Sequence, residues 1–138
     1  MAFIIDDVIK SLVDHGLALA RDRKSRTANA KKIFYNEVLR AFIGLYPTPS
    51  EWPLDIKRRL RSVFPKLQAA QETFRPFIHR WHRKAFDRAW DIYRVGVGGR
   101  PTIDAQMYHQ YRAFVGQPDP KEMFRKNVER LLSFANGI

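Results

Sequence analysis

Apolar residues recur every three or four positions along most of this 138-residue chain, the spacing that lines one side of an α-helix. One stripe near the N-terminus comprises Ile5, Val8, Ile9, Leu12, Gly16 and Leu19, and a second comprises Phe34, Val38, Ala41, Phe42 and Leu45. No segment alternates apolar and polar residues between hairpin turns, as a half-buried strand would. The sequence therefore predicts an all-α protein.

Prolines divide this helical pattern. The stretch LYPTPSEWP holds three prolines in seven residues and is expected to end the N-terminal helical region at about residue 45. The polar segment RDRKSRTANAKK before it contains no proline. A helix over residues 3–45 is therefore either unbroken or interrupted at Gly16 and residues 21–32, and both alternatives stay open at this point.

Shorter helices are expected beyond the proline-rich stretch: over 51–63 with Thr48 or Ser50 as cap, from Pro65, over 74–94, over 103–114 and from Pro120. At the last of these, Asp119, Pro120 and Glu122 form the pattern of a capping box with proline in the first helical position. We expect one domain over residues 1–138, a bundle of about five helices. A long or broken N-terminal helix (1–45) would precede a helical core (51–135).

The stretch FRPFIHRWHRKAFDRAWDIYR, residues 74–94, mixes aromatic and basic side chains. On a helical wheel its large apolar residues share one side, and its charged residues gather on the other. The inward set is Phe74, Phe77, Ile78, Trp81, Ala85, Phe86, Ala89, Trp90, Ile92 and Tyr93; the outward set is Arg80, Arg83, Lys84, Asp87, Asp91 and Arg94. Because Asp87 and Asp91 can pair with bases three or four positions away, we interpret this stretch as the central core helix with a salt-bridged outer face. Pro76 is expected to mark its start or a kink.

Patterns that would indicate catalysis are absent from the sequence. The chain has no cysteine, no nucleophile elbow and no phosphate-binding glycine motif, since GVGGR follows a predicted helix and is interpreted as a helix end. His79 and His82 alone are too few for a zinc site, which needs at least three protein ligands. We therefore expect no enzymatic activity, no metal and no cofactor.

Positive charge is concentrated in the middle of the chain. The formal net charge is +11; residues 21–61 hold eleven bases and four acids, and residues 62–100 hold eight bases and three acids. Such a field attracts nucleic acid, anionic surfaces or acidic proteins. The candidate contacts with an anionic partner are Arg21, Arg23, Lys24, Arg26, Lys31, Lys32, Lys57, Arg58, Arg59 and Arg61.

The N-terminal apolar stretch is interrupted by charges at Asp6, Asp7, Lys10 and Asp14, so it does not predict a membrane-spanning helix. It also lacks the basic start and small-residue cleavage site of a signal peptide. We expect a cytoplasmic protein, or one that lies peripherally on the inner face of the membrane.

Four stretches of the chain are distinctive: LYPTPSEWP, FPKLQAAQETFRPF, AFDRAWDIYR and NVERLLSFA. With them, the chain from about residue 17 to the end resembles a family of small bacterial proteins that has no assigned activity. Members of that family often carry a hydrophobic N-terminal anchor before a basic segment, whereas the corresponding stretch here contains four charged residues. The resemblance implies no catalytic residue, cofactor or substrate.

Two functional hypotheses follow from these patterns. The first is a non-catalytic protein that acts through protein–protein interaction or self-association, with a homo-oligomer formed through the apolar stripe of residues 3–19. The alternative is a nucleic-acid-binding protein that uses the basic residues 21–32 and 57–61.

Overall fold

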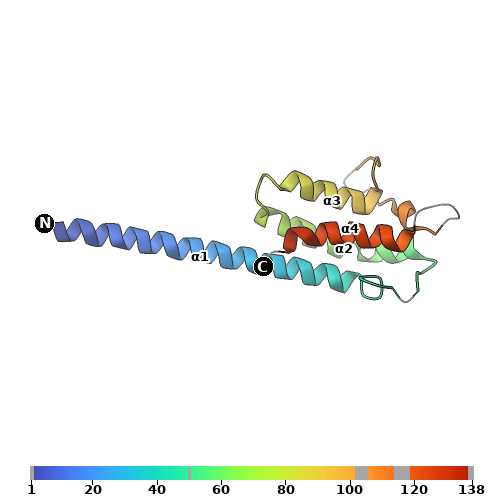
Figure 1. Ribbon diagram of the computed structural model, residues 1–138, viewed down its shortest axis with the longest axis horizontal. Helices are drawn as coiled ribbons and strands as arrows, with labels where there is room; N and C mark the ends of the chain where they lie inside the picture. Colours follow the sequence, from blue (N-terminus) through green and yellow to red (C-terminus); the bar gives the residue numbers. More distant parts are fainter. Residues whose placement is uncertain (1, 50, 102–105, 114–118, 137–138) are drawn as a thin grey trace.

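A computed structural model describes the whole chain except residues 1, 50, 102–105, 114–118 and 137–138, with side chains described from residue 7. The predicted all-α class is confirmed: the described residues form four α-helices and three 3-10 turns, and no strand (Figure 1). The α-helices are α1 (Ala2–Ala41), α2 (Ile56–Phe74), α3 (Arg83–Val95) and α4 (Pro120–Leu132). The 3-10 turns are η1 (Arg75–Phe77), η2 (Tyr108–Tyr111) and η3 (Ser133–Ala135).

Helix α1 is unbroken over 40 residues, about 60 Å at 1.5 Å per residue. Of the two alternatives for the N-terminal region, the continuous helix is therefore the one the structure adopts, and it ends four residues earlier than predicted. Neither Gly16 nor the polar run 21–32 interrupts it, because no residue within it lacks a backbone N–H. Only its second half packs against the other helices, and its first half runs clear of them (Figure 1).

Helix α2 differs from the prediction because it continues through Pro65 instead of starting there. Pro65 is exposed, so water can bond the carbonyl group that loses its partner at this proline. The helix begins after Asp55. Two residues were predicted as its N-cap. Thr48 lies seven residues before Asp55, which occupies the N-cap position, and Ser50 lies outside the described residues.

The predicted interruption at Pro76 does occur, but the prediction that a helix covers the rest of the stretch up to residue 94 is wrong. The chain leaves α2 at Phe74, makes the turn η1 through Pro76, and re-enters a helix only at Arg83. The turn reverses the chain, so α3 runs back alongside the bundle (Figure 1). Trp81, predicted to face inward, is consequently 76% exposed, and Arg94, predicted to face outward, is only 5% exposed.

Ion pairs and hydrogen bonds across this turn replace the predicted pairs along one helix. The Arg75 guanidinium donates two hydrogen bonds to the Asp87 carboxylate, at 2.8 and 2.9 Å. Arg83, expected to pair with Asp87, instead donates to the backbone carbonyls of Ile78 and Pro76. The predicted Asp91–Arg94 pair does form, with Arg94 Nη2 2.6 Å from Asp91 Oδ1.

The helix predicted over 103–114 falls partly outside the described residues, and its described part contains only the 3-10 turn η2. The start of α4 matches the prediction more closely. Asp119 accepts a hydrogen bond from the Lys121 backbone N–H at 3.0 Å, and Pro120 occupies the first turn. Glu122, expected to complete the capping box, pairs with Arg125 at 2.7 Å.

Aromatic rings fill the core between the second half of α1 and helices α2, α3 and α4. Phe34 of α1 stacks on Phe74 of α2 with ring centroids 4.6 Å apart, and both rings meet Phe86 of α3 edge-on. Near the other end, the Trp52 indole N–H donates to the Tyr111 carbonyl at 2.8 Å. These contacts hold α1 to the bundle from about Ala30 onwards.

Candidate functional site

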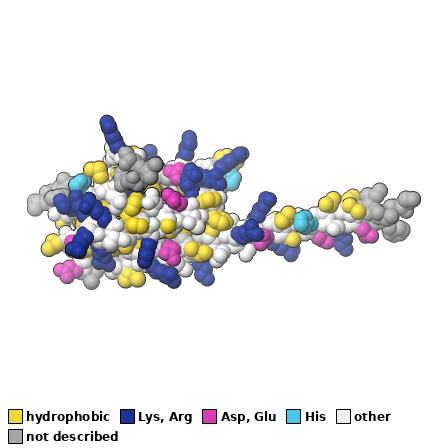
Figure 2. All heavy atoms as spheres, turned by 180° about the vertical axis from the view of Figure 1, so that it is seen from behind, with side chains coloured by type: hydrophobic (Ala, Val, Ile, Leu, Met, Phe, Trp, Pro, Cys, Tyr) yellow, Lys and Arg dark blue, Asp and Glu magenta, His cyan; other side chains and the backbone are white. Residues whose placement is uncertain are grey.

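The feature that sets this molecule apart is the projecting part of α1, residues 7–26, which we call the arm. Every side chain of the arm is exposed. At 1.5 Å per residue, the arm is about 30 Å long. Its large apolar residues are 46–66% exposed: Val8, Ile9, Leu12, Val13, Leu17 and Leu19. Figure 2 shows hydrophobic side chains along the surface of the arm, between charged ones.

The apolar stripe of the arm lies on the same side of α1 that packs into the bundle. Leu12 and Ala30 are eighteen residues apart, which is five turns of 3.6 residues, and so are Gly16 and Phe34. Phe34 is 3% exposed and Ala30 packs against the core, whereas Leu12 is 66% exposed. The arm therefore presents a helix face of core type that extends past the point where α2 ends.

Gly16 lies within this stripe. A Cβ atom added at Gly16 would meet no atom within 4 Å, so no contact within the chain requires a glycine at this position. A glycine inside a helix costs about 0.5–1 kcal/mol relative to alanine. A gap in the side-chain layer at this point permits another helix to approach closely.

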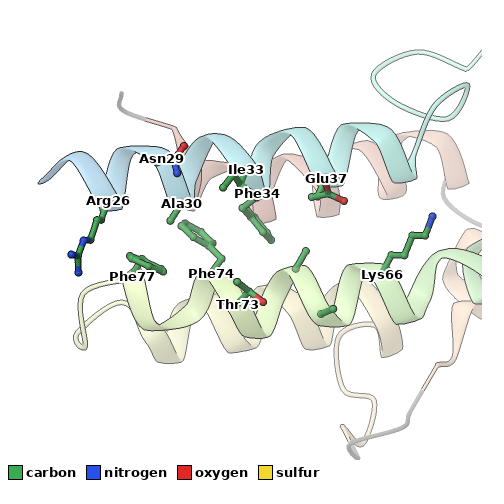
Figure 3. A pocket seen from close by; sticks show the side chains of 12 residues that line it. Arg26, Asn29, Ala30, Ile33, Phe34, Glu37, Lys66, Thr73, Phe74 and Phe77 are labelled. Atoms are coloured by element: carbon green, nitrogen blue, oxygen red, sulfur yellow. The ribbon is translucent and has the colours of Figure 1, made fainter. Parts of the chain in front are cut away.

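A groove of about 670 Å³ lies where the arm joins the bundle, between α1 and α2. Ala30, Ile33 and Phe34 of α1 face Phe74 across it, while Arg26 and Phe77 lie at the end nearest the arm (Figure 3). Its lining contains one acidic residue, Glu37, and two basic ones. Such a lining offers a mainly apolar surface for packing.

The first predicted basic cluster, residues 21–32, lies at the junction of arm and bundle. Arg21, Arg23 and Lys24 are exposed on the arm, and Arg26 forms an ion pair with Asp22 at 3.0 Å. Lys32 is exposed as well, whereas Lys31 is half-buried in a depression that it shares with His79 and His82. The structure thus adds two histidines to this cluster.

The second predicted cluster, residues 57–61, lies at the start of α2. Arg59 donates to the backbone carbonyl of Ile43 and so serves to hold the end of α1. Lys57 Nζ lies 2.7 Å from His109 Nδ1. Lys57, Arg58 and Arg61 line one depression together with Arg112 and Asp55. Among the described residues, no ion pair involves these four cations.

Mutual repulsion perturbs the ionisation of this second cluster. The Lys57 ammonium, partial burial and the charges of Arg112 and Arg61 lower the pKa of His109 from its ordinary value of 6.5. Partial burial, together with Arg112 and Arg61, lowers the pKa of Lys57. Sequence reasoning missed His109 and Arg112 because they lie about fifty residues from Lys57, in η2 and just after it.

The two basic clusters do not merge into one surface. Helices α1 and α2 run in opposite directions, so residues 21–32 lie near Phe77 while residues 57–61 lie near Ile43. From Lys57 to Phe74, α2 alone spans about 25 Å. Any anionic partner would meet two separate positive regions at opposite ends of the bundle.

The described residues were compared with the requirements of a metal site and of a membrane-spanning helix. Within the described ranges, no three His, Cys, Asp or Glu residues are placed to hold an ion, and the rings of His79 and His82 are 6.2 Å apart between centroids. None of the described helices combines the length and apolarity needed to cross a membrane.

The hydroxyl of the buried Tyr111 links three elements of the core. The Tyr111 hydroxyl donates to the Tyr93 carbonyl at 2.7 Å and accepts from the Asn127 amide at 3.0 Å. Burial raises the pKa of Tyr108 to about 12 and also raises the pKa of Tyr93 and of Tyr111. These phenols therefore stay protonated at neutral pH, and the Tyr111 hydroxyl joins η2 to α3 and α4.

Comparisons with protein-family models, with curated proteins and with solved structures gave no match. The surfaces described above are therefore the basis for any functional conclusion.

Proposed function

We propose that this protein is a non-catalytic interaction protein that associates with itself through the apolar stripe of its arm. One observation carries the proposal: Val8, Ile9, Leu12, Val13, Leu17 and Leu19 are all exposed on one 30-Å-scale helix segment that has no partner within the described chain. Monomeric proteins rarely expose a contiguous apolar surface of this kind.

The physical chemistry of the arm supports a partner helix. Most helices in proteins are stabilised mainly by packing an apolar face against a partner. The apolar residues of the stripe have the same spacing as those on the face of α1 that α2 covers. Another helix can therefore pack against the stripe as α2 packs against that face. A second copy of the chain carries the same stripe and is always available as a partner.

Light scattering of the full chain and of Leu12→Glu tests the proposal. Burying Leu12 in both copies of a symmetric dimer is worth about 4 kcal/mol, so its replacement by a charge is expected to weaken association about 1000-fold. The matched control is Leu54→Glu, because Leu54 is 104% exposed and lies outside the arm. Oligomers that Leu12→Glu abolishes and Leu54→Glu preserves support the proposal.

Two results would contradict it. One is a strict monomer at the highest concentration that stays in solution. The other is binding to anionic vesicles that depends on Leu12, without association in their absence, because that result would assign the stripe to a lipid surface.

A second candidate function, binding of a nucleic-acid backbone, is favoured by the cluster of Lys57, Arg58, Arg61 and Arg112. These cations share one depression and form no ion pair within the described residues, which leaves them available to phosphates. If this function holds, Arg58→Ala with Arg61→Ala weakens binding to DNA or RNA and lowers its salt dependence by about two units of slope.

Because the two basic clusters lie at opposite ends of the bundle, each can be tested separately. The matched pair of substitutions for the arm is Arg21→Ala with Arg23→Ala. If the affinity falls only in the variant with Arg21→Ala and Arg23→Ala, the nucleic acid contacts residues 21–32 instead. No binding of the unmodified protein at about 50 mM salt would exclude this second function.

A further inference from the structure

We infer that two copies of this chain pair through their arms in antiparallel orientation, crossing at Gly16. This inference rests on the proposed self-association and specifies its geometry. It follows from three observations: where the stripe lies relative to the bundle, how charge is distributed along the chain, and where the glycine lies within the stripe.

The first observation is steric. The stripe of the arm continues directly into the face of α1 that α2 and η1 cover, and Arg26 and Phe77 line the same end of the groove (Figure 3). In a parallel pair, the partner's α1 would run on along that face from residue 27 and would meet α2. In an antiparallel pair, only the first residues of α1 come opposite the partner's bundle, and no part of the first bundle stands there.

The second observation is electrostatic. Residues 27–138 hold twenty basic and ten acidic side chains, a net charge of +10, whereas residues 1–20 carry one lysine and three acids. A parallel pair would place the two positive bundles side by side. An antiparallel pair separates them by about the 30 Å length of the arm, several times the Debye length of about 8 Å at physiological salt.

The third observation is the place of Gly16. Gly16 belongs to the apolar stripe, and no contact within the chain requires a glycine at this position. In a symmetric antiparallel pair, the midpoint of the overlap lies on the two-fold axis, where each helix faces its own copy. A crossing at Gly16 places the residue with no side chain where the two backbones approach most closely, and Leu12 of one copy then faces Ala20 of the other.

Engineered cysteines measure the orientation cleanly, because the chain has no cysteine of its own. Ile9→Cys and Arg23→Cys lie on the stripe side, and their positions are equally far from Gly16. In the antiparallel pair residue 9 faces residue 23 of the other copy, whereas the two residues 9 are about 21 Å apart. A disulfide needs Cα atoms within about 7 Å.

The expected result is that a mixture of the two variants gives the mixed cross-link, while neither variant alone forms a covalent dimer. Cross-links of Ile9→Cys with itself and of Arg23→Cys with itself would show a parallel pair. That result would overturn the orientation and leave the proposed self-association standing. Light scattering of the same samples separates these cases from a monomer, which would overturn both proposals.

Gly16→Leu tests the crossing independently of orientation. A Cβ at this position has open space in the single chain, so the fold of the monomer is expected to be unchanged. In the pair, a side chain at the crossing would force the backbones apart and weaken association about tenfold or more. The matched control is Ala18→Leu on the opposite side of the same helix, which is expected to leave association unchanged. Equal effects from the two variants would overturn the crossing at Gly16.

Discussion

The two halves of α1 carry the same helical pattern of apolar residues, yet one half is buried and the other is exposed. Phe34 and Val38 are 3% and 1% exposed, whereas Leu12 and Val13 in the arm are 66% and 55% exposed. The difference arises because α2 ends at Phe74 and the chain turns back through η1. An amphipathic pattern therefore indicates that a helix has a partner, but not whether that partner belongs to the same chain.

The largest expected effect concerns the buried half. Phe34→Ala removes the ring that packs between Phe74 and Phe86, and is expected to lower the free energy of unfolding by about 3–5 kcal/mol. The neighbouring Ile33 is 52% exposed, so Ile33→Ala serves as control and is expected to change it by less than about 0.5 kcal/mol. Denaturant unfolding followed by circular dichroism measures both. Similar losses for the two variants would show that burial does not distinguish these sides of α1.

A smaller effect is expected from the polar contacts inside the bundle, which the arm lacks. Tyr111→Phe removes the hydroxyl that bonds the Tyr93 carbonyl and the Asn127 amide, both of which are buried. The expected loss is about 1–3 kcal/mol, because the groups left behind lose a partner away from water. Tyr35→Phe is a suitable control since Tyr35 is only partly buried. An unchanged free energy of unfolding would show that water replaces the hydroxyl.

In the arm, substitutions are expected to leave folding almost unchanged while they alter association. For Leu12→Glu at concentrations too low for association, the free energy of unfolding should stay within about 0.5 kcal/mol of the original. The physical reason is that Leu12 has no contact in the described bundle to lose. Unfolding measured at low and at high concentration separates the two effects. A large loss at low concentration would show that the arm contributes to the bundle itself.

The smallest effect concerns the basic end of the bundle. The positive charge of Lys57 lowers the pKa of His109, so His109 is expected to titrate below 6.5, and Lys57→Met is expected to raise its pKa toward that value. As pH falls through 6.5, the unfolded chain takes up the proton first, so stability decreases slightly until the folded His109 is also protonated. NMR titration of the imidazole measures this, with Lys66→Met as control. An unchanged pKa in Lys57→Met would show that Lys57 and His109 do not interact.

Local patterns allowed most of the helices to be predicted but not the turns between them. The periodicity of α1 and the Asp119-Pro120 start of α4 were sufficient to place those helices, because both depend on neighbouring residues. Pro65 and Pro76 gave the same local signal with opposite outcomes. Helix α2 passes through the exposed Pro65, whereas the chain turns back near Pro76, where Arg75 reaches Asp87 and Arg83 reaches the turn carbonyls.

For the candidate surfaces too, local patterns predicted the residues but not how they are arranged in space. The stripe of the arm was visible as a periodic pattern, and the bases of 21–32 and 57–61 were visible as clusters. Their separation to opposite ends could not be predicted, because it depends on α1 and α2 lying antiparallel. The approach of His109 and Arg112 to Lys57 joins residues about fifty positions apart, and no local pattern reports such a contact.

By itself, the sequence determined the all-α class, the apolar face of α1 and the excess of positive charge, since all three depend only on composition and on spacing along the chain. The tertiary structure alone decided which part of that face is covered. The reason is geometric: α2 spans 19 residues and α1 spans 40, so a hairpin of the two leaves the first half of α1 without a neighbour.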